Sequence, residues 1–126
     1  MDQDRFDKGL AARKAVLGAD YVEKNLAAAD DFNRPFQELL TEYCWGACWG
    51  EDTLSRKQRS LLNLGMIAAL NRMHEFEIHF RGAITNGISR DELRSILIQI
   101  SVYCGVPVGV ECFRIARKVF AEIDGA

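Results

Sequence analysis

The residues best suited to do chemistry are Glu75 and His79, which lie four positions apart in a segment that predicts a helix. Residues with this spacing lie side by side on a helix, one turn apart. A carboxylate beside an imidazole is a standard way to set a general acid or base near neutral pH. The pair could also be a surface contact with no role in chemistry, and the spacing alone favours that simpler interpretation.

Two arginines are candidates for binding a carboxylate. Arg59 and Arg81 each adjoin a strongly apolar segment, and the guanidinium fork can bind both oxygens of a carboxylate. The alternative is that these side chains reach into water from a helix end. Asn63 lies inside the apolar segment next to Arg59, so its amide must find a partner, either structural or in a pocket.

A second acid candidate is Glu111, one turn after the break at Gly105 and Pro107. Its surroundings are apolar, and burial raises the pKa of a carboxyl group. A metal site is not expected, because the two histidines and the scattered carboxylates lack the clustered spacing of zinc ligands. We expect His74, which has no obvious partner, to be exposed.

Two aromatic and two thiol side chains alternate in one short segment. Cys44 and Cys48 have three residues between them, not the two of a thioredoxin-type pair. Without a signal peptide, free thiols are the better interpretation. Trp45 and Trp49 are also four apart, and they predict either a core or interface contact or the wall of a pocket.

The elements that must position these residues are helices. The chain has only two prolines and no run of alternating β-branched residues, and Ser89 with Glu92 has the spacing of a capping box. The sequence predicts a single all-α domain over residues 1–126. The expected helices cover residues 4–17, 20–29, a segment from 35 that weakens at Gly46 and Gly50, 55–70, 73–85, 89–104 and 107–123.

Residues 61–70 and 96–110 are apolar at nearly every position. A helix that is apolar all round is buried on all sides. A chain of 126 residues can hardly cover two such helices by itself. We therefore expect a homo-oligomer whose subunits cover them.

Composition argues against several other partners. The net charge of −2 is not typical of a protein that binds nucleic acid. No run of like charges in the sequence is long enough to form a charged tail. No apolar stretch stays free of charge for the ~18 residues of a membrane span. The charged N-terminus is unlike a signal peptide. We expect a cytoplasmic protein with no nucleic-acid or membrane partner.

From Tyr43 onward, the chain resembles the carboxymuconolactone decarboxylase family. Several ordered motifs at matching spacing carry this resemblance over about two-thirds of the chain. They are Tyr43-Cys44-Trp45-Gly46 with Trp49, Leu54 to Leu64, Ala68 to Arg72, His79-Phe80-Arg81-Gly82-Ala83 with Asn86-Gly87, and Tyr103-Cys104-Gly105-Val106-Pro107.

The resemblance implies an alkyl hydroperoxidase D-like fold of about six to seven helices, assembled as a hexamer or trimer. It also implies cofactor-independent decarboxylation of 4-carboxymuconolactone to the β-ketoadipate enol-lactone, in the breakdown of protocatechuate. In such an enzyme His79 would donate the proton and Glu75 would tune it. The substrate would be held by the side chains of Arg59, Arg81, Trp45, Trp49 and Glu111.

Peroxidases of the same superfamily carry a Cys-x-x-Cys-x-x-x-His motif. If His79 is its histidine, then the two cysteine positions are Arg72 and Glu75, neither of which is a thiol. Peroxidase chemistry by that motif is therefore excluded. Three alternatives to the decarboxylase stay open: another small-molecule enzyme on this fold, a thiol redox protein that uses Cys44 and Cys48, and a ligand binder without chemistry.

Overall fold

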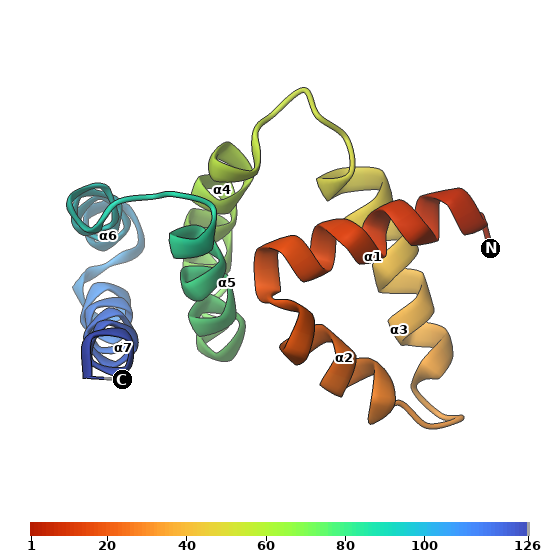
Figure 1. The fold of residues 1–126 in the computed structure, drawn as a ribbon. Helices are drawn as coiled ribbons and strands as arrows, with labels where there is room; N and C mark the ends of the chain where they lie inside the picture. Colours follow the sequence, from red (N-terminus) through yellow and green to blue (C-terminus); the bar gives the residue numbers. More distant parts are fainter. Residues whose placement is uncertain (126) are drawn as a thin grey trace. The chain divides into compact units, whose positions relative to one another are not determined.

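The computed structural model describes residues 1–125, and these residues form helices joined by turns (Figure 1). The predicted all-α class is confirmed. The chain divides into two compact units, residues 1–56 and residues 57 onward. That the chain is a single domain stays a prediction. No helix in the described part of the chain is long and apolar enough to cross a membrane.

The first unit has three α-helices and one π-helix among its described residues. They are α1 (Gln3–Leu17), α2 (Ala19–Ala27), α3 (Arg34–Leu40) and the π-helix η1 (Thr41–Trp49). The predicted helix start at Pro35 is confirmed, since Pro35 occupies the first turn of α3. The sequence does not predict the change to a π-helix at Thr41. Such wide turns are rare and occur often at functional sites.

The backbones of α1 and η1 approach each other closely at two glycines. A Cβ atom on Gly9 would lie 2.1 Å from the carbonyl oxygen of Thr41, and one on Gly46 would lie 2.3 Å from that of Arg5. Glycine alone permits such an approach, because it has no side chain. The Arg13 guanidinium fixes the same interface by donating to Thr41 Oγ1 at 3.2 Å.

Among its described residues, the second unit has four helices, which are α4 (Arg56–Ala69), α5 (Met73–Thr85), α6 (Arg90–Cys104) and α7 (Val106–Gly125). The predicted limits of α5 are confirmed, and Asn86 caps its C-terminal end. The predicted capping box is also confirmed, since Ser89 accepts from the backbone N–H of Glu92 while the Glu92 side chain accepts in return. Local signals in the sequence therefore set the ends of these helices.

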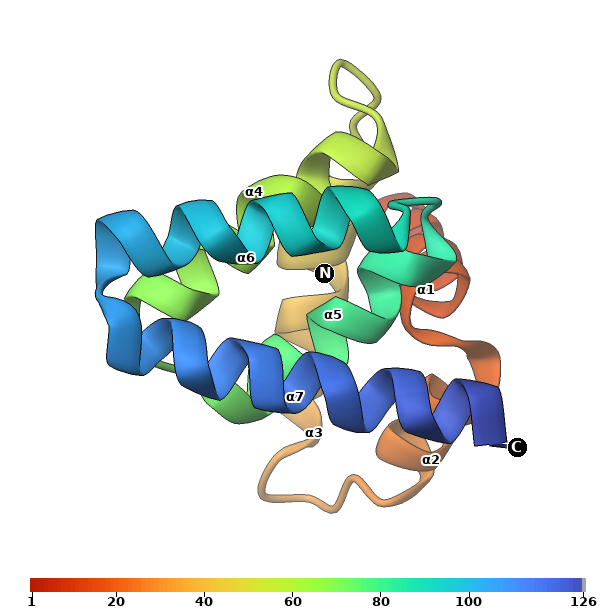
Figure 2. The ribbon, with the colours of Figure 1, turned by 90° about the vertical axis from the view of Figure 1, so that its left-hand side faces the viewer.

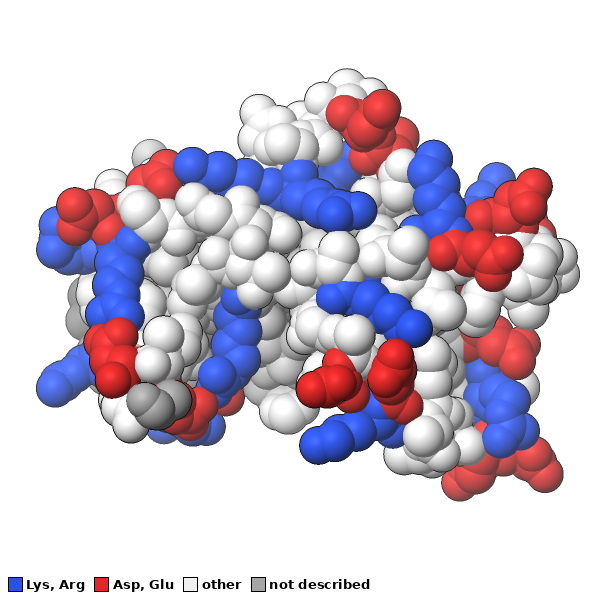
Figure 3. Space-filling model, viewed as in Figure 1, with Lys and Arg blue, Asp and Glu red and all other residues white. Residues whose placement is uncertain are grey.

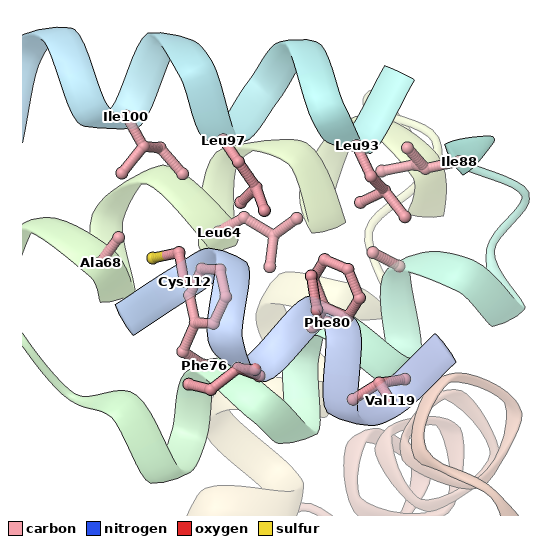
Figure 4. Packing of buried hydrophobic residues seen from close by; sticks show 13 residues of the cluster. Leu64, Ala68, Phe76, Phe80, Ile88, Leu93, Leu97, Ile100, Cys112 and Val119 are labelled. Carbon is pink, nitrogen blue, oxygen red and sulfur yellow. The ribbon is translucent and has the colours of Figure 1, made fainter. Parts of the chain in front are cut away.

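The core of the second unit draws side chains from all four helices (Figure 4). Leu64 of α4, Phe76 and Phe80 of α5, Leu97 of α6 and Cys112 of α7 are each at most 1% exposed. Helices α6 and α7 lie side by side after a sharp turn at Gly105, whose φ of 106° favours glycine (Figure 2). Burial of these side chains fixes α5 against α4.

Two of the apolar segments are only half covered within one chain. On α4 and the turn after it, Leu64 and Ala68 are buried, whereas Leu61, Leu62, Met66 and Leu70 are exposed. On α6 and the start of α7, the exposed apolar side chains are Ile98, Val102, Tyr103, Val106 and Val110. Charged side chains of both signs are interspersed on the face seen in Figure 3. That another subunit covers the exposed apolar side chains stays a prediction.

Replacement of Gly9 by alanine should destabilise the protein by about 2–3 kcal/mol, because the new methyl group overlaps the Thr41 carbonyl. Gly65 on α4 is the matched control, since nothing lies within 4 Å of a Cβ placed there. Gly65→Ala should leave the stability unchanged or raise it by up to about 1 kcal/mol. Denaturant unfolding measures both, and equal stability of the two variants would contradict the close approach.

Candidate active site

His79 lies on α5 as a partly buried side chain, next to the core residue Phe80. Removal from water disfavours the charged imidazolium, so burial lowers the pKa of His79. The Glu75 carboxylate, one turn earlier and exposed, raises the pKa of His79, but this effect is the smaller of the two. The predicted pair is thus close enough to interact electrostatically, and the resting ring is neutral near pH 7.

A line of polar side chains joins α4 to α5 within the second unit. Asn63 Nδ2 lies 3.4 Å from His79 Nδ1. Asn86 Nδ2 donates to the fully buried Ser60 Oγ at 2.8 Å. We call these four residues, Ser60, Asn63, His79 and Asn86, the polar seam. It provides the partner that the Asn63 amide was expected to need.

Arg59 adjoins the polar seam on α4. It precedes Ser60 directly and lies one helical turn before Asn63, so the two side chains share a flank of the helix. The side chain is partly buried, and its Nε atom is screened from solvent. A cation in this position suits the binding of a carboxylate next to His79.

Arg81 and Glu111 are each engaged by opposite charges. Arg81 donates to Glu77 at 3.2 Å and also bonds Glu122 of α7, and these carboxylates raise its pKa. Lys118 bonds Glu77 at 3.0 Å, and this bond is the main cause that lowers the pKa of Glu77. The network ties α5 to α7. The role predicted for Arg81 in substrate binding stays a prediction.

Glu111 forms an ion pair with Arg114 on the outer surface of α7. The sequence predicts a buried carboxyl group here, whereas the structure shows a half-buried one held by an exposed guanidinium. The partner lies only three residues away, which makes the pair a common local contact on a helix. A role in substrate binding stays a prediction for Glu111 as well.

Trp45 and Trp49 stack in the core of the first unit, with ring centroids 5.0 Å apart. Trp49 also borders a hollow of about 300 Å³, together with Lys8, Glu51 and Arg56. Both rings are buried, as a core contact requires, and Trp49 also meets the description of a pocket wall. That either ring contacts substrate stays a prediction.

The cysteines are free thiols in the structure, and their settings differ. Cys44 and Cys48 are exposed on η1, while Cys112 is buried in the core of the second unit. Burial raises the pKa of Cys112 to about 11, so it stays protonated near neutral pH. His74 is exposed, as expected. Within residues 1–125, no three histidine, cysteine or acidic side chains gather to hold a metal ion.

Sequence reasoning missed Ser60 and did not predict which residues would pair across the seam. One signal was available: Ser60 and Asn63 interrupt a largely apolar stretch, and His79 and Asn86 lie two turns apart on one flank of α5. Polar residues at matching intervals on two adjacent buried helices indicate hydrogen bonds between them.

Comparison with known proteins identifies the family of the chain. The model of the carboxymuconolactone decarboxylase family matches residues 34–118. A nitrosuccinic acid decarboxylase of Metarhizium robertsii is 44% identical over 94% of this chain and 82% of its own. A 4-carboxymuconolactone decarboxylase of Acinetobacter baylyi is 34% identical over 97% of this chain and 91% of its own.

The structure is thus that of an all-α protein with a partly buried histidine on α5. The chain belongs to the carboxymuconolactone decarboxylase family. Its activity is that of a carboxy-lyase, the enzyme class of both relatives.

The burial of His79 predicts how stability depends on pH. The pKa of His79 in the folded chain lies below the ordinary value of 6.5. Between 6.5 and that lower pKa, the unfolded chain binds more protons than the folded chain, and this difference favours unfolding. The advantage of wild type over His79→Gln should therefore be complete above pH 6.5 and shrink on acidification through this window. Denaturant unfolding of both proteins measures it, and a pH-independent difference would contradict the burial.

Proposed function

We propose that the chain decarboxylates a small dicarboxylate without a cofactor, and that 4-carboxymuconolactone is its substrate. The observation that carries the proposal is the partly buried His79, held beside Asn63 and near Arg59 in a member of this family. A histidine in such a place is suited to deliver a proton to a carbanion. In a sheltered site water is a poor proton donor for this step.

In the lactone, the departing carboxylate is attached to the ring carbon next to the ring oxygen. As the carbon–carbon bond breaks, its electron pair moves through the ring double bond onto the lactone carbonyl, and carbon dioxide leaves. The lactone itself takes up the electrons, so no cofactor is needed. His79 then gives a proton to the lactone carbon beside the carbonyl. The imidazole of His79 afterwards takes up a new proton from water.

The lowered pKa of His79 implies that the ring takes up the proton it later donates only when the substrate binds. The resting ring is neutral, because burial disfavours the imidazolium. A bound dianion favours the imidazolium and so raises the pKa of His79 when the proton is needed. Glu75 acts in the same direction before the substrate binds.

Arg59 is our choice for the group that binds the departing or the remaining carboxylate. It lies on the same flank of α4 as Asn63. Arg81 is the other candidate for this role, and it would share its guanidinium between Glu77, Glu122 and the substrate.

A second candidate substrate is nitrosuccinic acid. The relative that acts on it is 44% identical to this chain, against 34% for the lactone decarboxylase of Acinetobacter baylyi. The chemistry makes the same demands: the departing carboxylate shares a carbon with the nitro group, which takes up the electron pair as a nitronate. His79 would then protonate that carbon.

The exposed apolar side chains of α4 and α6 support assembly of several copies of the chain. Leu61, Leu62, Met66 and Leu70 form one apolar surface, and Ile98, Val102 and Tyr103 form another. Apolar patches of this kind mark protein interfaces. We propose a homo-oligomer, a trimer or hexamer, in which these surfaces meet.

His79→Gln and His79→Ala should each lower turnover of the preferred substrate by about 10²–10⁴-fold, the usual contribution of a general acid. His74→Gln is the matched control, because His74 is exposed on the same helix and should leave turnover unchanged. Carbon dioxide release measures all three. Near-wild-type turnover in both His79 variants would exclude His79 as the proton donor.

The substrate is decided by incubating the wild-type protein separately with 4-carboxymuconolactone and with nitrosuccinic acid. We expect carbon dioxide release with a higher kcat/KM for the lactone. A higher value for nitrosuccinic acid would replace the first candidate with the second. Release from neither substrate would contradict the proposed function.

A further inference from the structure

We propose that Asn63 is a positioning residue that occupies Nδ1 of His79, so that Nε2 is the nitrogen that exchanges protons with the substrate. The geometry of the polar seam supports this assignment directly. Its importance for the reaction rests on the function proposed above. The two parts can fail separately, and the tests below distinguish them.

The first step is the direction of the contact between the two side chains. Asn63 Nδ2 lies 3.4 Å from His79 Nδ1, at the long end of hydrogen-bonding distance. In this orientation the NH₂ group of the amide faces the ring and can only donate, so we infer that Nδ1 accepts with its lone pair. The neutral ring then carries its hydrogen on Nε2. In this way the partner on one nitrogen selects the tautomer of the whole ring.

The second step is the rigidity of the seam that holds Asn63. Asn63 is partly buried on α4, directly before the fully buried Leu64. One turn away, Ser60 Oγ accepts from Asn86 Nδ2 at 2.8 Å, and this bond also joins α4 to α5. The core residues Phe76 and Phe80 fix α5 on its other side. The amide is therefore held at a defined place relative to the imidazole.

The third step is the set of charges around the ring. On α5 the Glu75 carboxylate raises the pKa of His79, whereas burial lowers it more strongly. From α4 the group that faces Nδ1 is the neutral amide of Asn63. A hydrogen on Nδ1 would meet the NH₂ group, donor against donor, so the resting contact favours the neutral ring.

An amide has two ends, which suits it to both states of the ring. When the negative charge of the bound dianion raises the pKa of His79, the ring takes up a second proton from water, and rotation of the Asn63 amide places Oδ1 where it accepts from Nδ1–H. The Nε2–H bond then breaks as the new C–H bond forms, and the ring is left neutral with its hydrogen on Nδ1. Water returns a proton to Nε2. An aspartate at this position could serve only the state with Nδ1–H.

The test is a ¹⁵N spectrum of histidine-labelled full-length protein, recorded without substrate across the titration of His79. The chain has two histidines, so the spectrum of His74→Gln assigns the signals. We expect the wild-type neutral ring of His79 to carry hydrogen on Nε2 and none on Nδ1. Hydrogen on Nδ1 would overturn the proposal, and this measurement needs no variant of the seam.

Asn63→Asp is the sharpest variant because it keeps the shape of the side chain and removes the donor. The carboxylate should move the hydrogen to Nδ1 and raise the pKa of His79 above its wild-type value. Ser60→Ala is the matched control, since it breaks the other bond between α4 and α5. This variant loosens the seam but keeps the direct contact of Asn63 with His79, so the hydrogen should stay on Nε2. An unchanged spectrum in Asn63→Asp, or an equal change in Ser60→Ala, would contradict the proposal.

Kinetics separate this inference from the proposed function. In Asn63→Ala, kcat should fall by about tenfold or more with little change in KM, because ring orientation matters in the transition state. In Asn63→Asp, the pH profile of kcat/KM should shift upward with the pKa of His79. If the tautomer is as proposed but His79→Gln stays active, the proposed function fails alone. If His79→Gln is inactive but the tautomer is reversed, the role of Asn63 fails alone.

Discussion

The burial of His79 against α4 is the constraint on which the rest of the site depends. The core places it there: Phe76 and Phe80 anchor one face of α5, and the next position around the helix brings the imidazole toward α4. Polar groups at such an interface must find partners, because an unpaired buried donor costs about 1–3 kcal/mol. Packing of the core and hydrogen bonding to Asn63 thus both hold the imidazole of His79 against α4.

The electrostatics follow from that position. A charged imidazolium would be costly in a site removed from water, so the resting site holds a neutral ring and neutral amides inside. Arg59 is the cation beside the polar seam, and Arg81, Glu77 and Lys118 form a separate charged network that links α5 to α7. A substrate with two carboxylates would place negative charge beside the imidazole. This charge would stabilise the imidazolium and raise the pKa of His79. The site therefore gains its acid when it gains its substrate.

Local signals in the sequence predict the helices well, but not the way the helices pack. Ser89 with Glu92, and Asn86 with Gly87, mark helix ends because their effects act within one turn. The π-helix at Thr41 could not be predicted in this way. It packs against α1 through Gly9 and Gly46, a contact between segments more than thirty residues apart.

The candidate site shows the same division. The spacing of Glu75 and His79 predicts that they are neighbours, but it cannot predict that burial outweighs the carboxylate. Arg81 looks available in the sequence, yet its partner Glu122 comes from α7. The pair of Glu111 and Arg114 is local and could have been predicted from the three-residue spacing. Asn63 was recognised as a polar residue in need of a partner, and only the fold shows that the partner is His79.

The central claim is that one imidazole delivers a proton to one face of the carbanion. Decarboxylation in deuterium oxide tests it most directly, because a proton-delivering ring places a single deuterium on the product carbon with one configuration. The account predicts one deuterium and a single enantiomer from the wild-type protein, read at early times by NMR of the product in the presence of a chiral solvating agent. Equal amounts of both configurations would show that water protonates a free carbanion, and would contradict the role of His79.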